Sequence, residues 1–249
     1  MHILPQGQHT EEEINCSISD FIPVYKVRSL LQKCNAEKQK GISAMNIFRY
    51  KLVNVFSKSS FYMQVKTNHF SESYSKNTFY RFLNDPRINW LRFTTMLALA
   101  VIKNFFIPLT SNDRADVFII DYSLYERAGY KRTQMASKVF ELVTMKYKKG
   151  FRLLTLGWSD GNSFVPINSC LLASSKEDNQ LGDFTKVDSR SLAGRRRKMA
   201  VTKSPDVLLE LLRYAVNAGH SAKYVLFDSW FSNPNTIVKI KQMHLNTIV

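Results

Sequence analysis

Two aspartates stand where a side chain could do chemistry, each directly after a short run of strand-forming apolar residues. Asp121 closes the stretch DVFIID at 116–121, and Asp228 closes the stretch YVLFD at 224–228. Such runs predict strands buried on both faces, and an acid at the end of a buried strand has rigid support at the rim of a fold. Carboxylate oxygens are hard ligands suited to Mg²⁺ or Mn²⁺. Two such ions, about 3.5–4 Å apart, commonly serve in phosphodiester cleavage.

This pair of acids also has a simpler interpretation, because many α/β proteins place an aspartate after a strand only to cap the next helix. Two carboxylates also rarely hold two ions without a third acid. The charge of the chain favours the metal-binding interpretation of the two aspartates. Lys and Arg number 35 against 20 Asp and Glu, for a formal net charge of +15. A basic surface that holds DNA, with acids that hold metal ions, would suit attack on the DNA backbone.

The same positive charge could favour an anionic membrane surface, but no single basic amphipathic helix stands out. The most apolar window, 93–109, is interrupted by polar residues and a proline and is shorter than a bilayer span, which predicts a buried helix and no membrane partner. The N-terminus lacks the features of a signal peptide. The three cysteines are far apart in the chain. Together these features predict a reduced, cytoplasmic protein without disulfides.

The first 110 residues favour helices. Residues 1–40 are polar and mixed, and we expect a loosely held arm with a strand-like piece at 21–27 that leads into a helix around 29–40. From Ser43, a candidate N-cap, apolar residues recur at three- and four-residue steps, which predicts a helix with an inward stripe. The residues of this stripe are Met45, Phe48, Leu52 and Val55. A second short segment at 59–65 and a longer helix at 88–106 are expected to follow.

The stretch SYSKNTFYRFLNDP at 73–86 predicts a short helix with a basic and aromatic outer face. Its inward residues are Phe79, Phe82 and Leu83, and its outward residues are Lys76, Tyr80 and Arg81. Several short helices with such a face are compatible with a helix-turn-helix that places one helix in a DNA groove. They are equally compatible with an ordinary helical bundle whose charges face water. The three outward residues are the candidate DNA contacts of this region.

Beyond residue 110 strands and helices alternate, which predicts a mixed α/β layer. FRLLTLGW at 151–158 and SFVPINSCLLAS at 163–174 have the composition of strands, and the Asp160-Gly161 dipeptide between them favours a tight hairpin turn. Pro166 places the second strand at an edge or a bulge. Helices are expected from Ser204 to Gly219 and at 235–244, with a further strand starting near 245.

Two further features have both a functional and an ordinary interpretation. The polar connection at 175–203 contains a dense basic run, Arg195, Arg196, Arg197 and Lys198. This run either follows a phosphate backbone, where each contact adds to the salt dependence of binding, or forms a solvated loop. Trp230, beside Asp228, could stack on a flipped base, but packing under the next helix is the commoner fate of such a residue.

The stretches FIIDYSLYERAGYKR, GFRLLTLGWSDGNSFVPIN and YVLFDSWFSNP, in this order, resemble the catalytic domain of DDE-type transposases of bacterial insertion sequences. The resemblance runs from about residue 116 to the last residue, and 43–106 resemble the DNA-binding region of the same group more weakly. It implies a ribonuclease-H-like fold in which the first strand pairs with the hairpin and the strand of Asp228 lies beside it. It also implies that Asp121 and Asp228 are catalytic acids that bind two Mg²⁺ or Mn²⁺ ions. The implied partners are insertion-sequence ends and target DNA, and a homo-oligomer is an open alternative to a monomer.

In that family the third acid is a glutamate on a helix well downstream of the second aspartate. After Asp228 this sequence reads SWFSNPNTIVKIKQMHLNTIV, which contains neither Asp nor Glu. We therefore expect a transposase that is truncated at its C-terminus and cleaves DNA poorly or not at all alone. The alternative is a non-catalytic DNA-binding protein that occupies element ends or interferes with the full-length transposase. The expected parts are an arm at 1–40, a helical DNA-binding region at 41–110 and an incomplete ribonuclease-H-like domain at 111–249.

Overall fold

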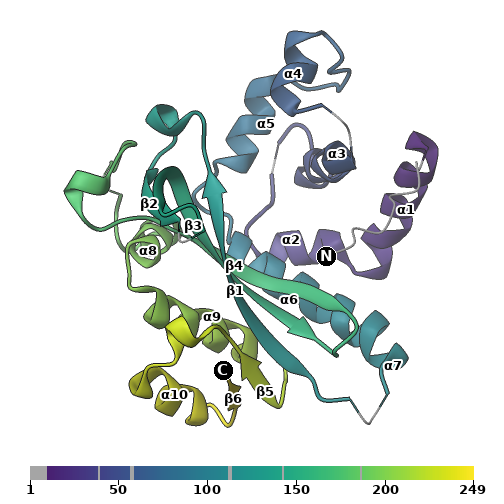
Figure 1. Cartoon of the computed structure of the whole chain (residues 1–249). Helices are drawn as coiled ribbons and strands as arrows, with labels where there is room; N and C mark the ends of the chain where they lie inside the picture. Colours follow the sequence, from purple (N-terminus) through teal and green to yellow (C-terminus); the bar gives the residue numbers. More distant parts are fainter. Residues whose placement is uncertain (1–9, 39, 57–58, 112–113, 142, 186) are drawn as a thin grey trace. The chain divides into compact units, whose positions relative to one another are not determined.

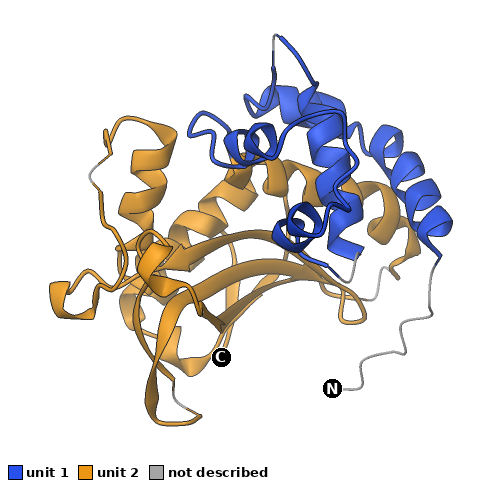
Figure 2. Cartoon of the chain, turned by 90° about the horizontal axis from the view of Figure 1, so that it is seen from above, with its two compact units in different colours: residues 1–89 blue, residues 90–249 orange. Residues whose placement is uncertain are grey.

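The computed structural model describes residues 10–38, 40–56, 59–111, 114–141, 143–185 and 187–249. The chain forms two compact units, residues 1–89 and 90–249, which Figure 2 shows in blue and orange. Among the described residues the first unit is helical, and the strands belong to the second. The helix that starts at Trp90, expected with the helices before it, groups instead with the strands.

The first unit contains five helices in the described residues, all visible in Figure 1. They are α1 (Glu11–Val24), α2 (Val27–Lys33), α3 (Ala44–Phe56), α4 (Phe61–Lys66) and α5 (Lys76–Leu83). The prediction of a loose arm with a strand-like piece is wrong for residues 10–33, which form α1 and α2. The reason is a capping box: the Thr10 hydroxyl accepts from the Glu13 backbone N–H, and the Glu13 carboxylate accepts from the Thr10 N–H.

An aromatic cluster organises the helices after residue 43. The ring of Tyr50 lies 5.4 Å from that of Phe70 and 5.6 Å from that of Phe79, in edge-to-face contacts. Met45 and Phe48 are buried as predicted, and the Asn46 N–H donates to the Ser43 hydroxyl, as expected of an N-cap. Val55, expected inside, is 65% exposed, so the inward stripe ends before the last turn of α3.

The second unit is built on a six-stranded sheet. Its strands are β1 (Val117–Glu126), β2 (Ser137–Glu141), β3 (Lys146–Ser159), β4 (Phe164–Leu172), β5 (Tyr224–Leu226) and β6 (Asn246–Ile248). β1 pairs antiparallel with β3 and parallel with β5, β3 pairs antiparallel with β4, and β6 runs parallel beside β5. The sheet therefore pairs the first strand with the hairpin on one side and with the strand of Asp228 on the other, as expected.

Helices cover one face of this sheet, and Figure 1 shows α6 and α9 beside the strands. The helical elements of this unit are α6 (Trp90–Val101), the π-helix η1 (Ile102–Phe106), α7 (Ile107–Leu109), α8 (Leu192–Ala200), α9 (Ser204–Asn217) and α10 (Pro234–Lys241). Three 3₁₀ turns accompany them: η2 (Tyr130–Arg132), η3 (Glu177–Asn179) and η4 (Ser229–Phe231). The Asn168 amide nitrogen of β4 donates to the Thr95 hydroxyl of α6 and to the Leu211 carbonyl of α9. Phe118, Leu156 and Trp158 are fully buried beneath these helices.

The helical run Trp90–Leu109 departs from its prediction. It has 20 residues and is long and apolar enough, by length and composition, to cross a membrane, and 28% of its most apolar stretch is buried. The run ends at Leu109, directly after Pro108, whereas the predicted helix ended at residue 106, before the proline. In the structure α6 packs along β4 on its buried side, so the helix is partly covered rather than buried.

The hairpin between β3 and β4 has the predicted turn. Gly161 adopts a φ of +91°, a conformation that side chains with a Cβ atom avoid. Pro166 lies in an edge strand, and the register shifts beside it between Leu156 and Gly157, which marks the expected bulge. The Asn233 side chain caps α10, which begins at Pro234, one residue before the predicted start.

Candidate metal and DNA site

The parallel register of β1 and β5 brings the two aspartates level with each other. The last pair of the ladder joins Ile119 to Leu226. Asp121 and Asp228 each come two residues later, so the same register carried past the end of β5 places them side by side. Because successive side chains alternate between faces, both aspartates lie on the face that holds Ile119 and Leu226, and both are exposed.

The sequence prediction that β1 ends at Asp121 is wrong. The strand continues for five residues because β3 is long enough to pair with it as far as Glu126, which lies opposite Gly150. Asp121 is thus in the middle of β1, opposite Thr155, yet just beyond the point where pairing with β5 stops. Asp121 therefore lies at an edge of the sheet because the neighbouring strand β5 ends there, and not because β1 itself ends.

Both carboxylates have short contacts with neighbouring hydroxyl groups. Asp121 accepts a hydrogen bond from the Ser123 hydroxyl at 2.6 Å. Asp228 accepts from the Ser229 hydroxyl at 3.0 Å and from the Trp230 backbone N–H at 3.1 Å, and it is the N-cap of the turn η4. The capping role that gave Asp228 its ordinary interpretation is therefore present. It uses one carboxylate oxygen, Oδ1, and leaves Oδ2 as a further ligand atom.

The donor set suits a hard divalent cation, because it offers exposed carboxylate oxygens together with hydroxyl oxygens. Asp121 and Asp228 would hold such an ion between the two strands. Across the described parts of the chain, however, no group of three or more His, Cys, Asp or Glu side chains gathers at one place. The register of β1 and β5 thus sets two acids level with each other, and among the described residues no third acid joins them.

Comparison with known families decides the class of protein. A family described as DDE superfamily endonuclease matches residues 62–249. The chain belongs to this family. The mixed sheet fits the ribonuclease-H-like fold that the resemblance implied, and the family implies an enzyme that cleaves nucleic acid with DNA as substrate, usually with divalent metal ions. No curated protein matches the chain.

The basic run of this DDE family member lies on a helix, not in the connection or solvated loop that the sequence suggested. α8 holds Arg195, Arg196 and Lys198 exposed to solvent. A Cβ atom on Gly194 would come within 2.0 Å of the Asp188 carbonyl oxygen, so this glycine lets α8 pack closely on the preceding loop. That packing is a tertiary contact, which explains why the local sequence did not reveal the helix.

Arg197 differs from the other basic residues of α8. Its guanidinium donates to the Thr185 carbonyl oxygen at 2.6 Å and to the Gln134 side-chain oxygen. These bonds tie α8 to two loops of the same unit. Arg197, one of the predicted DNA contacts, is therefore bonded within its own unit, whereas Arg195, Arg196 and Lys198 are exposed.

A hollow of about 490 Å³ connects α8 with the face of the sheet that holds the acids. Its lining includes Arg196, Tyr125, Leu153 and Ser169. By strand alternation Tyr125 lies on the same face of β1 as Asp121, and the ladder places Leu153 and Ser169 on that face of β3 and β4. Sequence reasoning did not single out this face as a whole, because the register between β1 and β3 depends on pairing between distant segments.

The other DNA candidates lie in the first unit, on α5. Lys76, Tyr80 and Arg81 are exposed as predicted, while Phe79 and Phe82 are buried. The Tyr80 ring is 41% exposed and lies 5.2 Å from the Phe61 ring, so one part of it packs and the other faces solvent. The helix thus presents a cationic and aromatic outer surface, but only two basic residues contribute to it.

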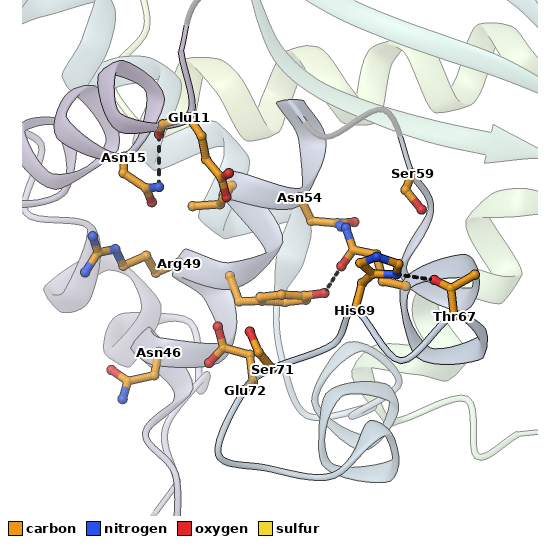
Figure 3. A pocket seen from close by; sticks show the side chains of 13 residues that line it. Glu11, Asn15, Asn46, Arg49, Asn54, Ser59, Thr67, His69, Ser71 and Glu72 are labelled. Atoms are coloured by element: carbon orange, nitrogen blue, oxygen red, sulfur yellow. Dashed lines mark hydrogen bonds between the residues drawn. The ribbon is translucent and has the colours of Figure 1, made fainter.

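A polar hollow of about 850 Å³ also occurs in the first unit (Figure 3). Arg49, Glu11, Glu72 and His69 contribute to its lining, and the His69 ring nitrogen lies 2.8 Å from the Thr67 hydroxyl. Two carboxylates against one arginine do not concentrate positive charge, so this hollow is a poor site for phosphate. It contains neither aspartate of the predicted pair, which belong to the second unit.

Proposed function

We propose that this endonuclease domain serves a DDE transposase, which cuts the ends of an insertion sequence and transfers them to target DNA. The observation that carries the proposal is the register that sets Asp121 beside Asp228 on an open face of the sheet. Mg²⁺ or Mn²⁺, when bound, would activate the attacking oxygen and stabilise the leaving oxygen at a phosphodiester. The two aspartates would hold and orient the ions, and the protein would act in the cytoplasm.

The open face of the sheet offers a path for DNA from the acids towards α8. Tyr125 is four residues beyond Asp121 along β1, which corresponds to about 13 Å at the rise of an extended strand. The hollow that Tyr125 lines also contains Arg196. A duplex whose scissile phosphate meets the aspartates could therefore place a neighbouring phosphate near Arg196, with Arg195 and Lys198 on the same helix.

The proposed site needs a third carboxylate, and residues 229–249 contain neither Asp nor Glu. Two carboxylates can hold one divalent ion but provide little for a second. The 249-residue polypeptide assayed alone is therefore expected to cut DNA weakly or not at all. A polypeptide that continues through a helix bearing a glutamate is expected to cut.

A second candidate function is DNA binding without cleavage, in which the protein occupies element ends or interferes with an active transposase. Two observations favour it: no third acid gathers with the pair among the described residues, and α8 exposes three cations. Replacing Arg195, Arg196 and Lys198 with Ala is expected to lower the slope of log affinity against log salt by roughly 0.9 for each phosphate that is no longer neutralised. Arg197→Ala is the matched control, because Arg197 is bonded to its own chain and should affect stability more than this slope.

The test is nicking of a supercoiled plasmid that contains the element ends, in the presence of Mg²⁺ or Mn²⁺. The 249-residue chain is compared with the longer polypeptide, and each is also made with Asp121→Ala and with Asp228→Ala. Asp178→Ala serves as the control, because Asp178 is an exposed acid in the short turn η3, outside the proposed site.

The transposase proposal is supported if the longer polypeptide cuts and the 249-residue chain does not. Cleavage must also be lost when either aspartate is replaced and retained in the Asp178→Ala variant. If the 249-residue chain also cuts, and stops cutting with Asp121→Ala, the requirement for a downstream glutamate is wrong. If neither polypeptide cuts but both bind DNA, the binding function is supported instead.

A further inference from the structure

The aromatic residues on either side of the second aspartate differ strongly in their exposure to solvent. Phe227 is 4% exposed and Phe231 is 1% exposed, whereas Trp230, between them, is 71% exposed. Large aromatic side chains are usually well buried, because exposing them forfeits much of their hydrophobic stabilisation. The sequence-based expectation that Trp230 packs under the next helix is therefore wrong, since Phe231 takes the buried position.

The backbone that presents Trp230 is fixed on both sides. The Trp230 N–H donates to Asp228 Oδ1 at 3.1 Å, which ties the indole to the carboxylate proposed to bind metal. On the other side the Phe231 ring lies 5.7 Å from the Tyr122 ring of β1, in an edge-to-face contact. An exposed side chain on such an anchored turn has a defined position beside the acids.

A flat exposed aromatic beside a phosphodiester site has an obvious ligand in a base of the DNA. A phosphate that reaches two carboxylates past the end of β5 brings its attached nucleotides with it. A base that leaves the duplex stack loses stacking energy, and an aromatic side chain can restore it irrespective of base identity. The contact is uncharged, so it would depend little on salt, unlike the contacts of α8.

We infer that Trp230 is a stacking site for an unpaired nucleobase next to the phosphodiester that the two aspartates address. The inference rests on the proposed function, because it takes DNA as the ligand of this face. It assigns Trp230 to holding the nucleotide in place, whereas the aspartates hold the metal. It also explains why the turn buries its phenylalanine and leaves its tryptophan in solvent.

The experiment uses the 249-residue chain and two DNA probes of equal length and sequence. One is a fully paired duplex, and the other has a single unpaired 2-aminopurine next to a nick. Trp230→Ala is expected to weaken binding of the unpaired probe by about 5- to 150-fold, which is the contribution typical of stacking on one base, and to change binding of the paired duplex less than about twofold. Trp230→Phe keeps a smaller aromatic ring, so its affinity for the unpaired probe should lie between those of the unchanged chain and of Trp230→Ala.

Tyr147→Ala is the matched control, because Tyr147 is a similarly exposed aromatic, 64% exposed, on β3. It should bind both probes like the unchanged chain. A second measurement reports the stacking directly: in a Trp90→Phe background the remaining tryptophans are the buried Trp158 and the exposed Trp230. Stacking should then quench the 2-aminopurine emission and protect the tryptophan emission from acrylamide.

The inference is overturned if Trp230→Ala binds the unpaired probe as tightly as the unchanged chain does. It is also overturned if the variant binds both probes equally poorly, because that result indicates a general role in folding or in duplex binding. If the unchanged chain binds neither probe, the proposed function fails first and the inference fails with it. The inference is supported if Trp230→Ala weakens binding of the unpaired probe and leaves binding of the paired duplex unchanged.

Discussion

The central sheet uses aspartates in two different ways at two places along β1. Near the start of β1, Asp160 is 5% exposed. Its carboxylate accepts from the Thr110 hydroxyl and from the backbone N–H groups of Asn162 and Ser163, and it lies 3.7 Å from the Arg114 guanidinium. At the level where the pairing of β1 with β5 has ended, Asp121 and Asp228 are exposed to solvent. Their carboxylates accept hydrogen bonds from the hydroxyl groups of Ser123 and Ser229 and from one backbone N–H.

This difference separates an acid that holds the fold together from acids available to a ligand. The Thr110 hydroxyl and the Ser163 N–H lower the pKa of Asp160 to about 2, because they bond the charged form. Such an acid stabilises the hairpin and has few oxygen lone pairs left to offer. An acid that is to bind metal must keep its oxygens open to solvent, which costs the fold the stabilisation that Asp160 provides.

The largest effect is expected from Asp160→Ala. The change leaves the hydrogen-bond donors of Thr110, Asn162 and Ser163 without their buried acceptor, so we expect a loss of about 2–4 kcal/mol in the free energy of unfolding. Urea unfolding followed by circular dichroism measures it. Unchanged stability would show that the hairpin end does not depend on its acid, and the contrast between the two regions would fail.

A second effect is the dependence of stability on pH. Because the pKa of Asp160 in the folded chain, about 2, lies below its ordinary value of 3.8, its contribution is fully present above pH 4 and is lost as the pH falls towards 2. The stability gap between the unchanged chain and Asp160→Asn should therefore narrow over this range, by about 2 kcal/mol. Unfolding curves at pH 5, 4, 3 and 2.5 provide the measurement, and a gap that stays constant would contradict the assignment.

The smallest effect on stability is expected from Asp121→Asn and Asp228→Asn. Both side chains are exposed, and each change removes one of two negative charges that lie level on neighbouring strands. The free energy of unfolding should change by less than about 0.5 kcal/mol, with a small gain as the favoured direction. Thermal unfolding of both variants beside Asp160→Asn sharpens the comparison, and a loss of more than about 1 kcal/mol in either would assign that aspartate to the fold.

The sequence predicted the parts of this arrangement that local residues determine. The apolar runs before Asp121 and Asp228 revealed both strands, and Asp160-Gly161 revealed the hairpin turn. Local residues also specified α1 through its capping box at Thr10, although we expected a loosely held arm in this region. The signal was present in that case and was not used.

Other features depended on contacts between distant segments and could not be read locally. Asp121 lies in mid-strand because β3 continues alongside it, and α8 is shaped by the approach of Gly194 to the backbone of Asp188. The choice between Trp230 and Phe231 for the buried position depends on Tyr122 of β1. The burial of Asp160 likewise depends on Thr110 and Arg114, about 50 residues earlier in the chain.

The most direct test of the central claim is whether Asp121 and Asp228 bind the same divalent ion. Fe²⁺ bound in place of Mg²⁺ generates hydroxyl radicals with ascorbate and peroxide, and these radicals cut the polypeptide close to the ion. We predict scission near both residue 121 and residue 228, suppressed by excess Mg²⁺ and abolished at both places in Asp121→Asn and in Asp228→Asn, but retained in Asp160→Asn. Scission at only one of the two places, or scission at both that survives Asp121→Asn, would contradict the account.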